Sequence, residues 1–242
     1  MSPTKRQIID TIPQPAHARN YLQVTEFTRP GSAFPDIVFG RSNGTDVAVK
    51  ALTVIVPKEA AADFAATMTF EDIVHTLLGC VPGSSVVLIH QNRPITYLPW
   101  SDDGTETELR YNVQVELPGG IIEQGELKGF AAKREMLEEA GLLNHRIICV
   151  ADLYFGYLAN SAGHQKERYG MSLIIATGDI GPVTMGQTEE GIVKAELVPL
   201  IDIHKHLDTL AESGHLIEWA AYLGTERLSR LLFAAHMATY LP

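Results

Sequence analysis

The sequence predicts an α/β (α+β) fold in which helices cover a mixed β-sheet. Three observations support this prediction. The first half of the chain contains short runs rich in β-branched residues, such as DVAVKALTVIVP at 46–57. From residue 112 onward the pattern alternates between strand, loop and helix, which is typical of layered α/β folds rather than of a pure barrel or bundle. The chain has 242 residues, of which 45% are hydrophobic, so it can bury a substantial core.

The first half is expected to consist mainly of strands. Runs with strand character, bounded by Gly, Pro or Asn turn residues, lie at 21–28, 36–39, 46–57 and 84–90. Residues 58–79 differ, because Ala, Leu and acidic residues recur there at helical spacing, with a break near 67–69 and Gly79 as the expected C-terminal cap. Residues 1–20 are polar and contain three prolines, which predicts a loose arm.

The second half is expected to alternate. Strands are predicted at 112–117, 146–155, 171–177 and 192–199, a helix at 126–140 closed by Gly141, and one or two amphipathic helices at 215–240. The chain is therefore divided into an N-terminal arm and β extension, residues 1–45, and a main domain, residues 46–242. Residues 58–83 form a helical insertion within that main domain.

Composition excludes several classes of protein. Lys and Arg total 19 against 29 Asp and Glu, and a net charge of −10 argues against a nucleic-acid partner. No run approaches the roughly 20 apolar residues that span a bilayer, so no membrane association is expected. The first 15 residues have no apolar core of a signal peptide, which predicts a cytoplasmic protein. The two cysteines, Cys80 and Cys149, are expected to pack in the interior.

Three carboxylates of the predicted helix 126–140 point to metal chemistry. Glu135, Glu138 and Glu139 are related by three and four positions, so they share one helical face and repel one another. A hard divalent cation, Mg²⁺ or Mn²⁺, is the natural counter-charge for such oxygen ligands. The turn before the helix ends in Gly119 and Gly120, where the absence of side chains lets the backbone approach a metal or phosphate.

Residues 120–142 resemble the complete Nudix box. The matching positions are Gly120, then after five residues Glu126, and after seven more Arg134-Glu135-Met136-x-Glu138-Glu139-x-Gly141-Leu142. The resemblance implies the Nudix α/β/α sandwich, with the box as its loop–helix–loop, the N-terminal β extension and a C-terminal helix. It also implies an enzyme that uses water and a divalent metal to hydrolyse a nucleoside diphosphate linked to another group.

The same resemblance assigns roles to individual residues. Glu135, Glu138, Glu139 and the Gly119 carbonyl are expected to bind the metal, and Glu135 and Glu139 to serve catalysis. Arg134 and Glu126 are expected to orient these carboxylates.

A further carboxylate often comes from a loop after the box, as metal ligand or general base. Glu189 and Glu190 in the segment QTEEG are the expected source, and Glu167 is the competing candidate.

The expected substrate is ADP-ribose or a related nucleoside diphosphate sugar. The segment VVLIHQNR at 86–93 is similar to the strand and Gln-x-Arg of ADP-ribose pyrophosphatases, and 116–120 resembles their Glu-Leu-Pro-Ala-Gly with Gly119 in place of Ala. Residues 161–168 resemble their Ser-Pro-Gly-x-x-x-Glu-Arg loop. The residues expected to bind the substrate are Arg93, Gln91, Gly120 and Glu167. In that subfamily the N-terminal strands help to form a dimer, so a homodimer is expected.

Two alternatives remain open at this stage. The proline that marks the subfamily is replaced by Ala162 in this chain. Tyr157 follows the box at a distance along the sequence at which some dinucleoside polyphosphate hydrolases have a tyrosine. Dinucleoside polyphosphates or nucleoside triphosphates are therefore the competing substrates. A sensor that binds a nucleotide sugar without cleaving it is a third hypothesis. The intact box argues against the sensor. His204 and His206 are expected to be exposed on a helix and not to bind zinc.

Overall fold

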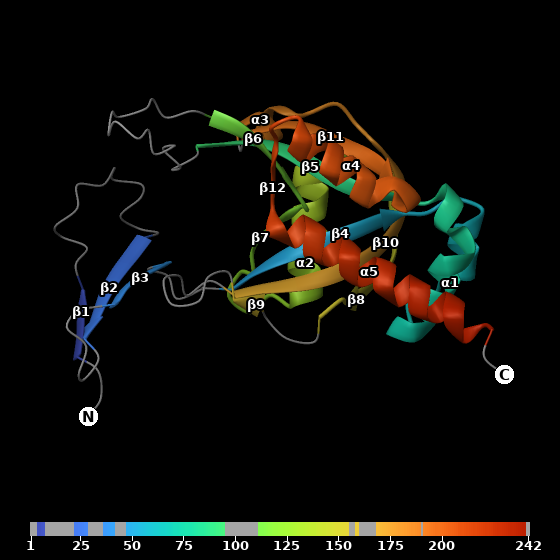
Figure 1. Cartoon of the computed structure of the whole chain (residues 1–242), viewed down its shortest axis with the longest axis horizontal. Helices are drawn as coiled ribbons and strands as arrows, with labels where there is room; N and C mark the ends of the chain where they lie inside the picture. The colour runs from blue at the N-terminus through green and yellow to red at the C-terminus, as the bar shows by residue number, and fades with distance from the viewer. Residues whose placement is uncertain are drawn as a thin grey trace.

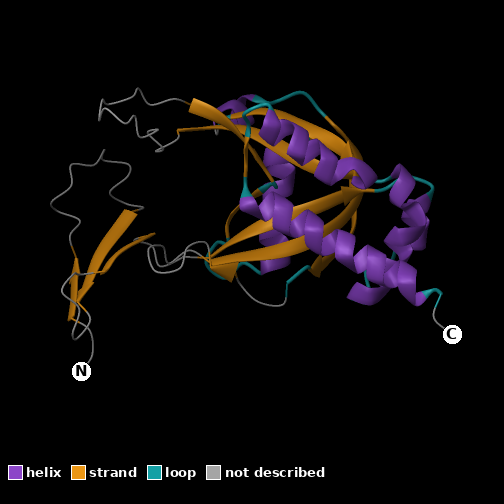
Figure 2. Cartoon of the chain, viewed as in Figure 1, coloured by secondary structure: helices purple, strands orange, loops and turns teal. Residues whose placement is uncertain are grey.

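The structure is a computed structural model that describes residues 4–7, 22–28, 36–41, 47–94, 111–154, 158–159, 168–189 and 191–240. Within these residues a mixed sheet is covered by helices on both faces, which confirms the predicted α/β class (Figures 1 and 2). No helix in the described ranges is long and apolar enough to cross a membrane.

A small antiparallel sheet forms in the N-terminal extension. It consists of β1 (Thr4–Gln7), β2 (Leu22–Thr28) and β3 (Asp36–Arg41), in that order. The predicted strands at 21–28 and 36–39 are confirmed. The prediction of a loose arm is wrong for residues 4–7, because this short polar segment pairs with residues 25–28 of β2. Such a strand has no hydrophobic periodicity of its own and is defined only by its partner.

The main sheet of nine strands is organised around β4 (Val47–Ile55). The other strands are β5 (Ser85–Pro94), β6 (Tyr111–Glu116), β7 (Gly119–Ile121), β8 (Leu142–Asp152), β9 (Leu158–Ala159), β10 (Arg168–Ile180), β11 (Ile192–Pro199) and β12 (Leu216–Ile217). Strand β4 pairs in parallel with β10 along its whole length. Its N-terminal half also pairs with β7, and its C-terminal end pairs with β5.

The two faces of β4 enter two different cores, because successive side chains of a strand point to opposite faces. Val49 and Ala51 pack against helix α2 (Lys128–Ala140). Leu52 and Val54 belong to the core under α1 (Phe70–Cys80) and α5 (Trp219–Ala238). Figure 1 shows α5 crossing the face of the sheet opposite α2. This is the predicted α/β/α layering.

The helical insertion divides where the sequence predicted a break. A 3-10 helix, η3 (Ala60–Asp63), precedes α1, and η4 (Val81–Gly83) follows it. Thr69 caps α1: its Oγ1 accepts a hydrogen bond from the Asp72 backbone N–H at 3.2 Å, and an Asp72 carboxylate oxygen accepts one from the Thr69 N–H at 3.1 Å. Gly79 lies inside α1, so its predicted role as a cap is wrong.

The C-terminal part contains α3 (Met185–Glu189), η5 (Leu200–Asp202), α4 (Ile203–Glu212) and then α5. The region 215–240 forms one helix preceded by the short strand β12, not two helices. His206 on α4 is only 33% exposed, because its Nε2 lies 2.9 Å from Glu196 Oε1. The prediction that His204 and His206 are exposed on a helix is therefore correct only in part, because both are partly buried, and the His204 Nε2 lies 3.1 Å from Ser229 Oγ. Cys149 is buried, as predicted, and Cys80 is partly buried.

Candidate active site

The turn at residues 117–120, hereafter the glycine turn, is pressed against β4. The Ala51 N–H donates to the Pro118 carbonyl at 2.8 Å, and in the strand register Gly119 lies opposite Lys50 and Gly120 opposite Val49. A Cβ atom at Gly119 would lie only 2.3 Å from the Val49 carbonyl oxygen. The close approach of two backbones therefore requires glycine at this position.

Helix α2 presents two buried carboxylates to the glycine turn. Glu135 is 9% exposed and Glu139 is 6% exposed, and they share a face because they are four residues apart. A Cβ at Gly120 would lie 2.3 Å from Glu135 Oε1, so the Glu135 carboxylate sits directly against this glycine. The side chain of Glu138 is 54% exposed and lies at the edge of the pair.

Arg134 joins the box loop to the helix. Its Nε and Nη2 atoms donate to the two oxygens of Glu126 at 3.2 and 3.0 Å, and Nη2 also donates to the Ile121 carbonyl at 2.9 Å. Its Nη1 donates to Glu135 Oε1 at 2.7 Å and to Glu138 Oε2 at 3.2 Å. Hydrogen bonds from Arg134 lower the pKa of Glu126. The planar guanidinium thus fixes three box carboxylates at once.

Glu139 has a different environment. Its Oε2 accepts a hydrogen bond from the Gly119 N–H at 2.6 Å, and it forms no ion pair with any described residue. Burial raises the pKa of Glu139 to about 8, and the nearby carboxylates of Glu135 and Glu116 act in the same direction. The Gly119 N–H and the Lys50 ammonium oppose this rise only in part. The surroundings of Glu139 therefore disfavour its ionised form.

The chemistry of these donors fits a hard divalent cation. The carboxylates and the turn carbonyls are all oxygen donors, which Mg²⁺ and Mn²⁺ prefer. Among the described residues, no three His, Cys, Asp or Glu side chains already lie together in a geometry that could hold a metal ion. Arg134 accounts for part of this, since it hydrogen-bonds both Glu135 and Glu138. Burial disfavours the ionised form of Glu139, and a cation beside this carboxylate would offset that cost, which favours a cation here.

A buried lysine lies beneath the glycine turn. Lys50 is 4% exposed, and its Nζ lies 3.0 Å from Glu116 Oε2, 2.9 Å from Glu218 Oε1 and 3.3 Å from the Leu117 carbonyl oxygen. Burial lowers the pKa of Lys50, but the charges of Glu218 and Glu116 outweigh it and raise the pKa above its usual value. Lys50 is therefore a charged group shared by β4, β6 and the start of α5.

Helix α3 is tied to the end of α2 through Gln187. The buried side chain of Gln187 donates from Nε2 to the Glu139 carbonyl at 2.6 Å and accepts at Oε1 from the Thr184 N–H at 2.7 Å. On the other side, the Gly191 carbonyl accepts from the Asn92 N–H at 2.8 Å. The chain immediately before residue 189 and immediately after residue 190 is therefore anchored to α2 and to β5, respectively.

The remaining predicted site residues are placed only in part. Gln91 is buried in β5, where it lies opposite Gln114 of β6 and Ile192 of β11. Arg93 lies two residues further along β5, and Glu189 ends α3, but their side chains are outside the described residues. The candidates that lie entirely outside the described residues are Glu190, Glu167, Tyr157 and Ala162.

Sequence reasoning missed three residues that surround this site. Lys50 carried a signal, because a single charged residue inside the apolar run 46–57 is buried only when it is paired. Glu218 and Gln187 carried none. Their roles depend on contacts with residues far away in the sequence, which no local pattern indicates.

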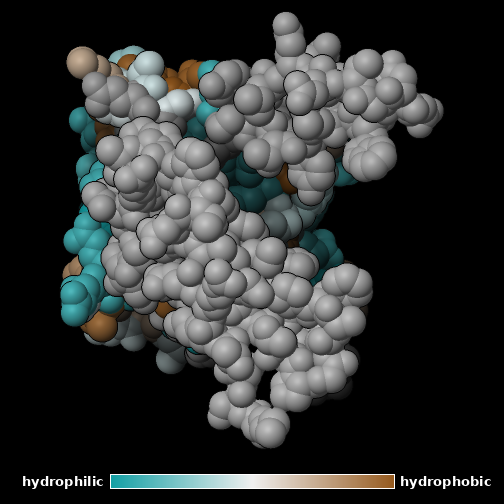
Figure 3. Space-filling view, turned by 90° about the vertical axis from the view of Figure 1, so that its left-hand side faces the viewer, coloured by the Kyte–Doolittle hydropathy of each residue, from teal (hydrophilic) through white to brown (hydrophobic). Residues whose placement is uncertain are grey.

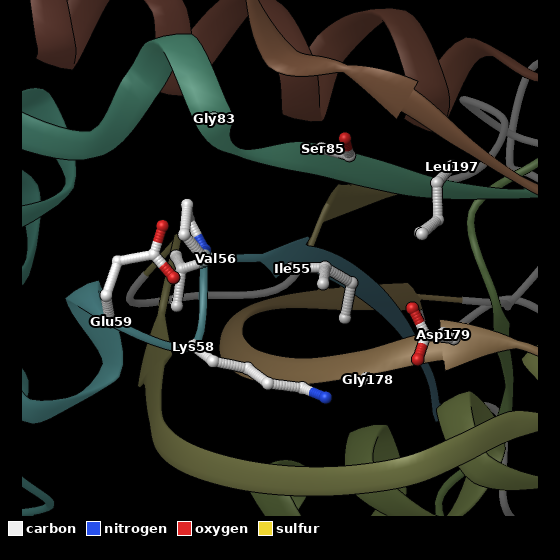
Figure 4. A pocket seen from close by; sticks show the side chains of 10 residues that line it. Ile55, Val56, Lys58, Glu59, Gly83, Ser85, Gly178, Asp179 and Leu197 are labelled. Carbon is white, nitrogen blue, oxygen red and sulfur yellow. The ribbon is translucent and has the colours of Figure 1, made fainter.

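A separate pocket lies at the opposite end of β4, away from the glycine turn. It has a volume of about 440 Å³ and is lined by both ends of the helical insertion and by the C-terminal part of β10. Figure 4 shows the Lys58 side chain directed along the wall that carries Gly178 and Asp179. No box residue lines this pocket.

On the side of the molecule that carries β7 and β9, the visible described surface includes a hydrophilic patch (Figure 3).

A comparison with family profiles identifies one family. A profile described as the NUDIX domain matches residues 80–220, which is more than half of the chain and includes the whole box. Among solved structures, the crystal structure of a Nudix hydrolase from M. smegmatis, RenU, is similar, with 16% sequence identity, 84% of this chain and 92% of that chain covered, and a TM-score of 0.39. A search of curated proteins found no match.

Proposed function

Because the chain belongs to the Nudix family and is a Nudix hydrolase, we propose that it cleaves the pyrophosphate bond of ADP-ribose or a related nucleoside diphosphate sugar. The products are a nucleoside monophosphate and a sugar phosphate. The reaction uses Mg²⁺, with Mn²⁺ as a substitute. The observation that carries the metal-dependent hydrolysis in this proposal is the buried carboxylate of Glu139, which the Gly119 N–H holds against the glycine turn.

The proposed metal ligands are Glu135, Glu138, Glu139 and the Gly119 carbonyl. When bound, the divalent metal neutralises the pyrophosphate and lowers the pKa of an attacking water. The Gly119 N–H orients Glu139, and the absence of a side chain at Gly120 leaves room beside Glu135. A cation among these carboxylates also explains how an acidic protein binds an acidic substrate.

Arg134 and Glu126 orient the metal-binding carboxylates in this proposal. The guanidinium holds Glu135 and Glu138 on the helix and Glu126 on the loop, so it fixes the distance between the two segments. Mutation of such orienting partners typically weakens metal binding or activity 10- to 100-fold.

The general base is proposed to be Glu190 or Glu189, with Glu167 as the competing candidate. A base must accept a proton from the attacking water within hydrogen-bond reach. The anchors at Gln187 and Gly191 support the first choice, because they fix the chain on both sides of Glu189 and Glu190 to elements of the site.

The substrate proposal rests on β5. The Asn92 N–H donates to the Gly191 carbonyl at 2.8 Å, and Ile192 lies opposite Gln91, so this part of β5 lies next to the chain that follows Glu190. Arginine binds phosphate oxygens with a two-pronged geometry, and we propose that Arg93 does so with the substrate. Gln91, Gly120 and Glu167 complete the proposed contacts with substrate.

Dinucleoside polyphosphates and nucleoside triphosphates remain the second candidate, because Ala162 replaces the marker proline and Tyr157 has a suitable spacing. A non-catalytic sensor is the weakest candidate, since burying Glu139 costs stability that a sensor has no need to sacrifice. We further propose a cytoplasmic homodimer to which the strands β1–β3 of the N-terminal extension contribute.

The test is phosphate release from ADP-ribose with Mg²⁺, coupled to a phosphatase that attacks only monoester products. Nucleoside diphosphate sugars, a dinucleoside polyphosphate and nucleoside triphosphates run in parallel. Glu139→Gln should abolish turnover, as should a chelator. Glu123→Gln is the matched control, because Glu123 is an exposed glutamate of the box loop outside the defined box positions. Activity that survives in Glu139→Gln would refute the metal-ligand assignment. Turnover only of another substrate class would replace ADP-ribose.

A further inference from the structure

We propose that Lys50 is a positioning residue of the active site, which holds the glycine turn in place and links it to helix α5. The inference rests on the proposed metal-dependent hydrolysis, because the turn positioned by Lys50 carries the Gly119 groups that face the metal ligands. Lys50 lies outside the Nudix box and outside the residue range matched by the family profile.

The burial of Lys50 is costly for folding alone. Removing an ammonium group from water carries a penalty of several kcal/mol, and replacing a buried ion pair by apolar residues is often neutral or even stabilising. The neighbours of Lys50 on the same face of β4, Leu52 and Val54, show that an apolar side chain suits this core. The lysine therefore has a use other than stability.

The contacts of Lys50 show what that use is. Three consecutive residues of the turn are each held by a different group: the Leu117 carbonyl by Lys50 Nζ at 3.3 Å, the Pro118 carbonyl by the Ala51 N–H at 2.8 Å, and the Gly119 N–H by Glu139 Oε2 at 2.6 Å. The aliphatic part of Lys50 also supports Gly119, since a Cβ there would lie 2.6 Å from Lys50 Cδ. Moving Lys50 therefore moves the Gly119 backbone and, through it, Glu139.

Lys50 also connects the turn to the helix layer on the other side of the sheet. Glu218, which immediately precedes α5, contacts Lys50 Nζ at 2.9 Å, and the Glu218 N–H donates to the Val115 carbonyl at 2.9 Å. Glu116 of β6 contacts the same ammonium at 3.0 Å. One lysine therefore joins β4, β6, the glycine turn and the start of α5, while α2 lies on the opposite face (Figure 1).

The test compares three changes in the full chain. Lys50→Met in a background with Glu116→Gln and Glu218→Gln removes the charged network without leaving unpaired charges. Glu218→Gln alone weakens only the link to α5. Leu228→Ala is the control, because Leu228 is fully buried in α5, about 15 Å along the helix from Glu218, and its truncation destabilises the helix packing while all three charged groups of the Lys50 network are kept. The readouts are Mn²⁺ binding without substrate by calorimetry, kcat and KM with the best substrate, and the melting temperature.

A positioning role predicts that the triple variant binds Mn²⁺ about 10- to 100-fold more weakly and loses kcat by a similar factor, with KM changed less than about threefold. Glu218→Gln should show smaller losses of Mn²⁺ affinity and of kcat. Leu228→Ala should lower the melting temperature and leave Mn²⁺ affinity and kcat unchanged. A folded triple variant that binds Mn²⁺ like the wild type would overturn the proposal. If the triple variant does not fold, unchanged Mn²⁺ binding in Glu218→Gln overturns the link to α5. A wild-type protein that binds no Mn²⁺ would overturn the metal-dependent reaction itself, and this role with it.

Discussion

Replacing Glu139 by Gln should stabilise the metal-free protein, although it abolishes the proposed activity. The pKa of Glu139 is raised from 4.5 to about 8 by burial, so the folded state binds this proton more tightly than the unfolded state. Its contribution to stability is therefore greatest below pH 4.5 and is lost as the pH rises toward 8. At pH 7 the loss amounts to about 3 kcal/mol as an upper figure. Glutamine avoids this loss and still offers an oxygen to the Gly119 N–H.

The expected change in melting temperature is measurable. For a chain of this size, about 3 kcal/mol corresponds to roughly 6–12 °C, and partial relaxation of the carboxylate toward solvent reduces the gain. Calorimetry in the presence of a chelator at pH 5, 7 and 8 should show that the advantage of Glu139→Gln over wild type grows with pH. Glu138→Gln is the matched control, because that side chain is 54% exposed and should change little. An advantage that is absent at pH 8, or equal at pH 5 and pH 8, would refute the argument from burial.

Three further outcomes are expected. Gly120→Ala should lower kcat by about 100-fold and leave the melting temperature nearly unchanged. The added Cβ would lie 2.3 Å from the Glu135 carboxylate, which must move away. Steady-state kinetics and calorimetry test this, and an unaltered kcat would contradict it. Gln187→Leu should lower the free energy of unfolding by about 1–3 kcal/mol, because the buried Glu139 carbonyl loses its hydrogen-bond donor. Urea denaturation measures this, and an unchanged urea midpoint would count against that hydrogen bond. Arg134→Lys should weaken Mn²⁺ binding about 10-fold in calorimetry, since a lysine cannot hydrogen-bond Glu135 and Glu138 with the geometry of the guanidinium. Wild-type affinity for Mn²⁺ would show that Arg134 does not orient these two carboxylates.

The helix of the box could be predicted in detail from the sequence, because its signals are local. The apolar positions of 128–140 repeat at helical spacing, and Gly141 ends the helix with a φ of 60°. The pairing of Arg134 with Glu126 and Glu138 also follows from spacing along one helix and its preceding loop. The local predictions for this helix were therefore confirmed, except that it begins at Lys128 and not at residue 126. Local signals also failed at Gly79, which lies inside α1.

The supporting residues could not be predicted, because their contacts are distant in the sequence. Lys50 acquires its role from Glu116 and Glu218, which lie 66 and 168 positions away along the chain. Gln187 contacts Glu139 across 48 positions. No periodicity links such residues. The pairing of β7 with β4 places Lys50 beside the glycine turn, and the pairing of β12 with β6 places Glu218 near Glu116. The short strands β7 and β12 were missed for the same reason.

The paired glycines of the turn also bear on which substitutions this chain can accept. Alanine in place of Gly119 would give the Glu-Leu-Pro-Ala-Gly pattern that the segment resembles, and by composition that is a minor change. The Val49 carbonyl, however, occupies the space that the new methyl group would need. Alanine at position 119 would therefore require β4 and β7 to separate in the same step. A substitution that adds one methyl group is consequently inaccessible to this chain by a single mutation, unless a change in β4 or β7 makes room for it first.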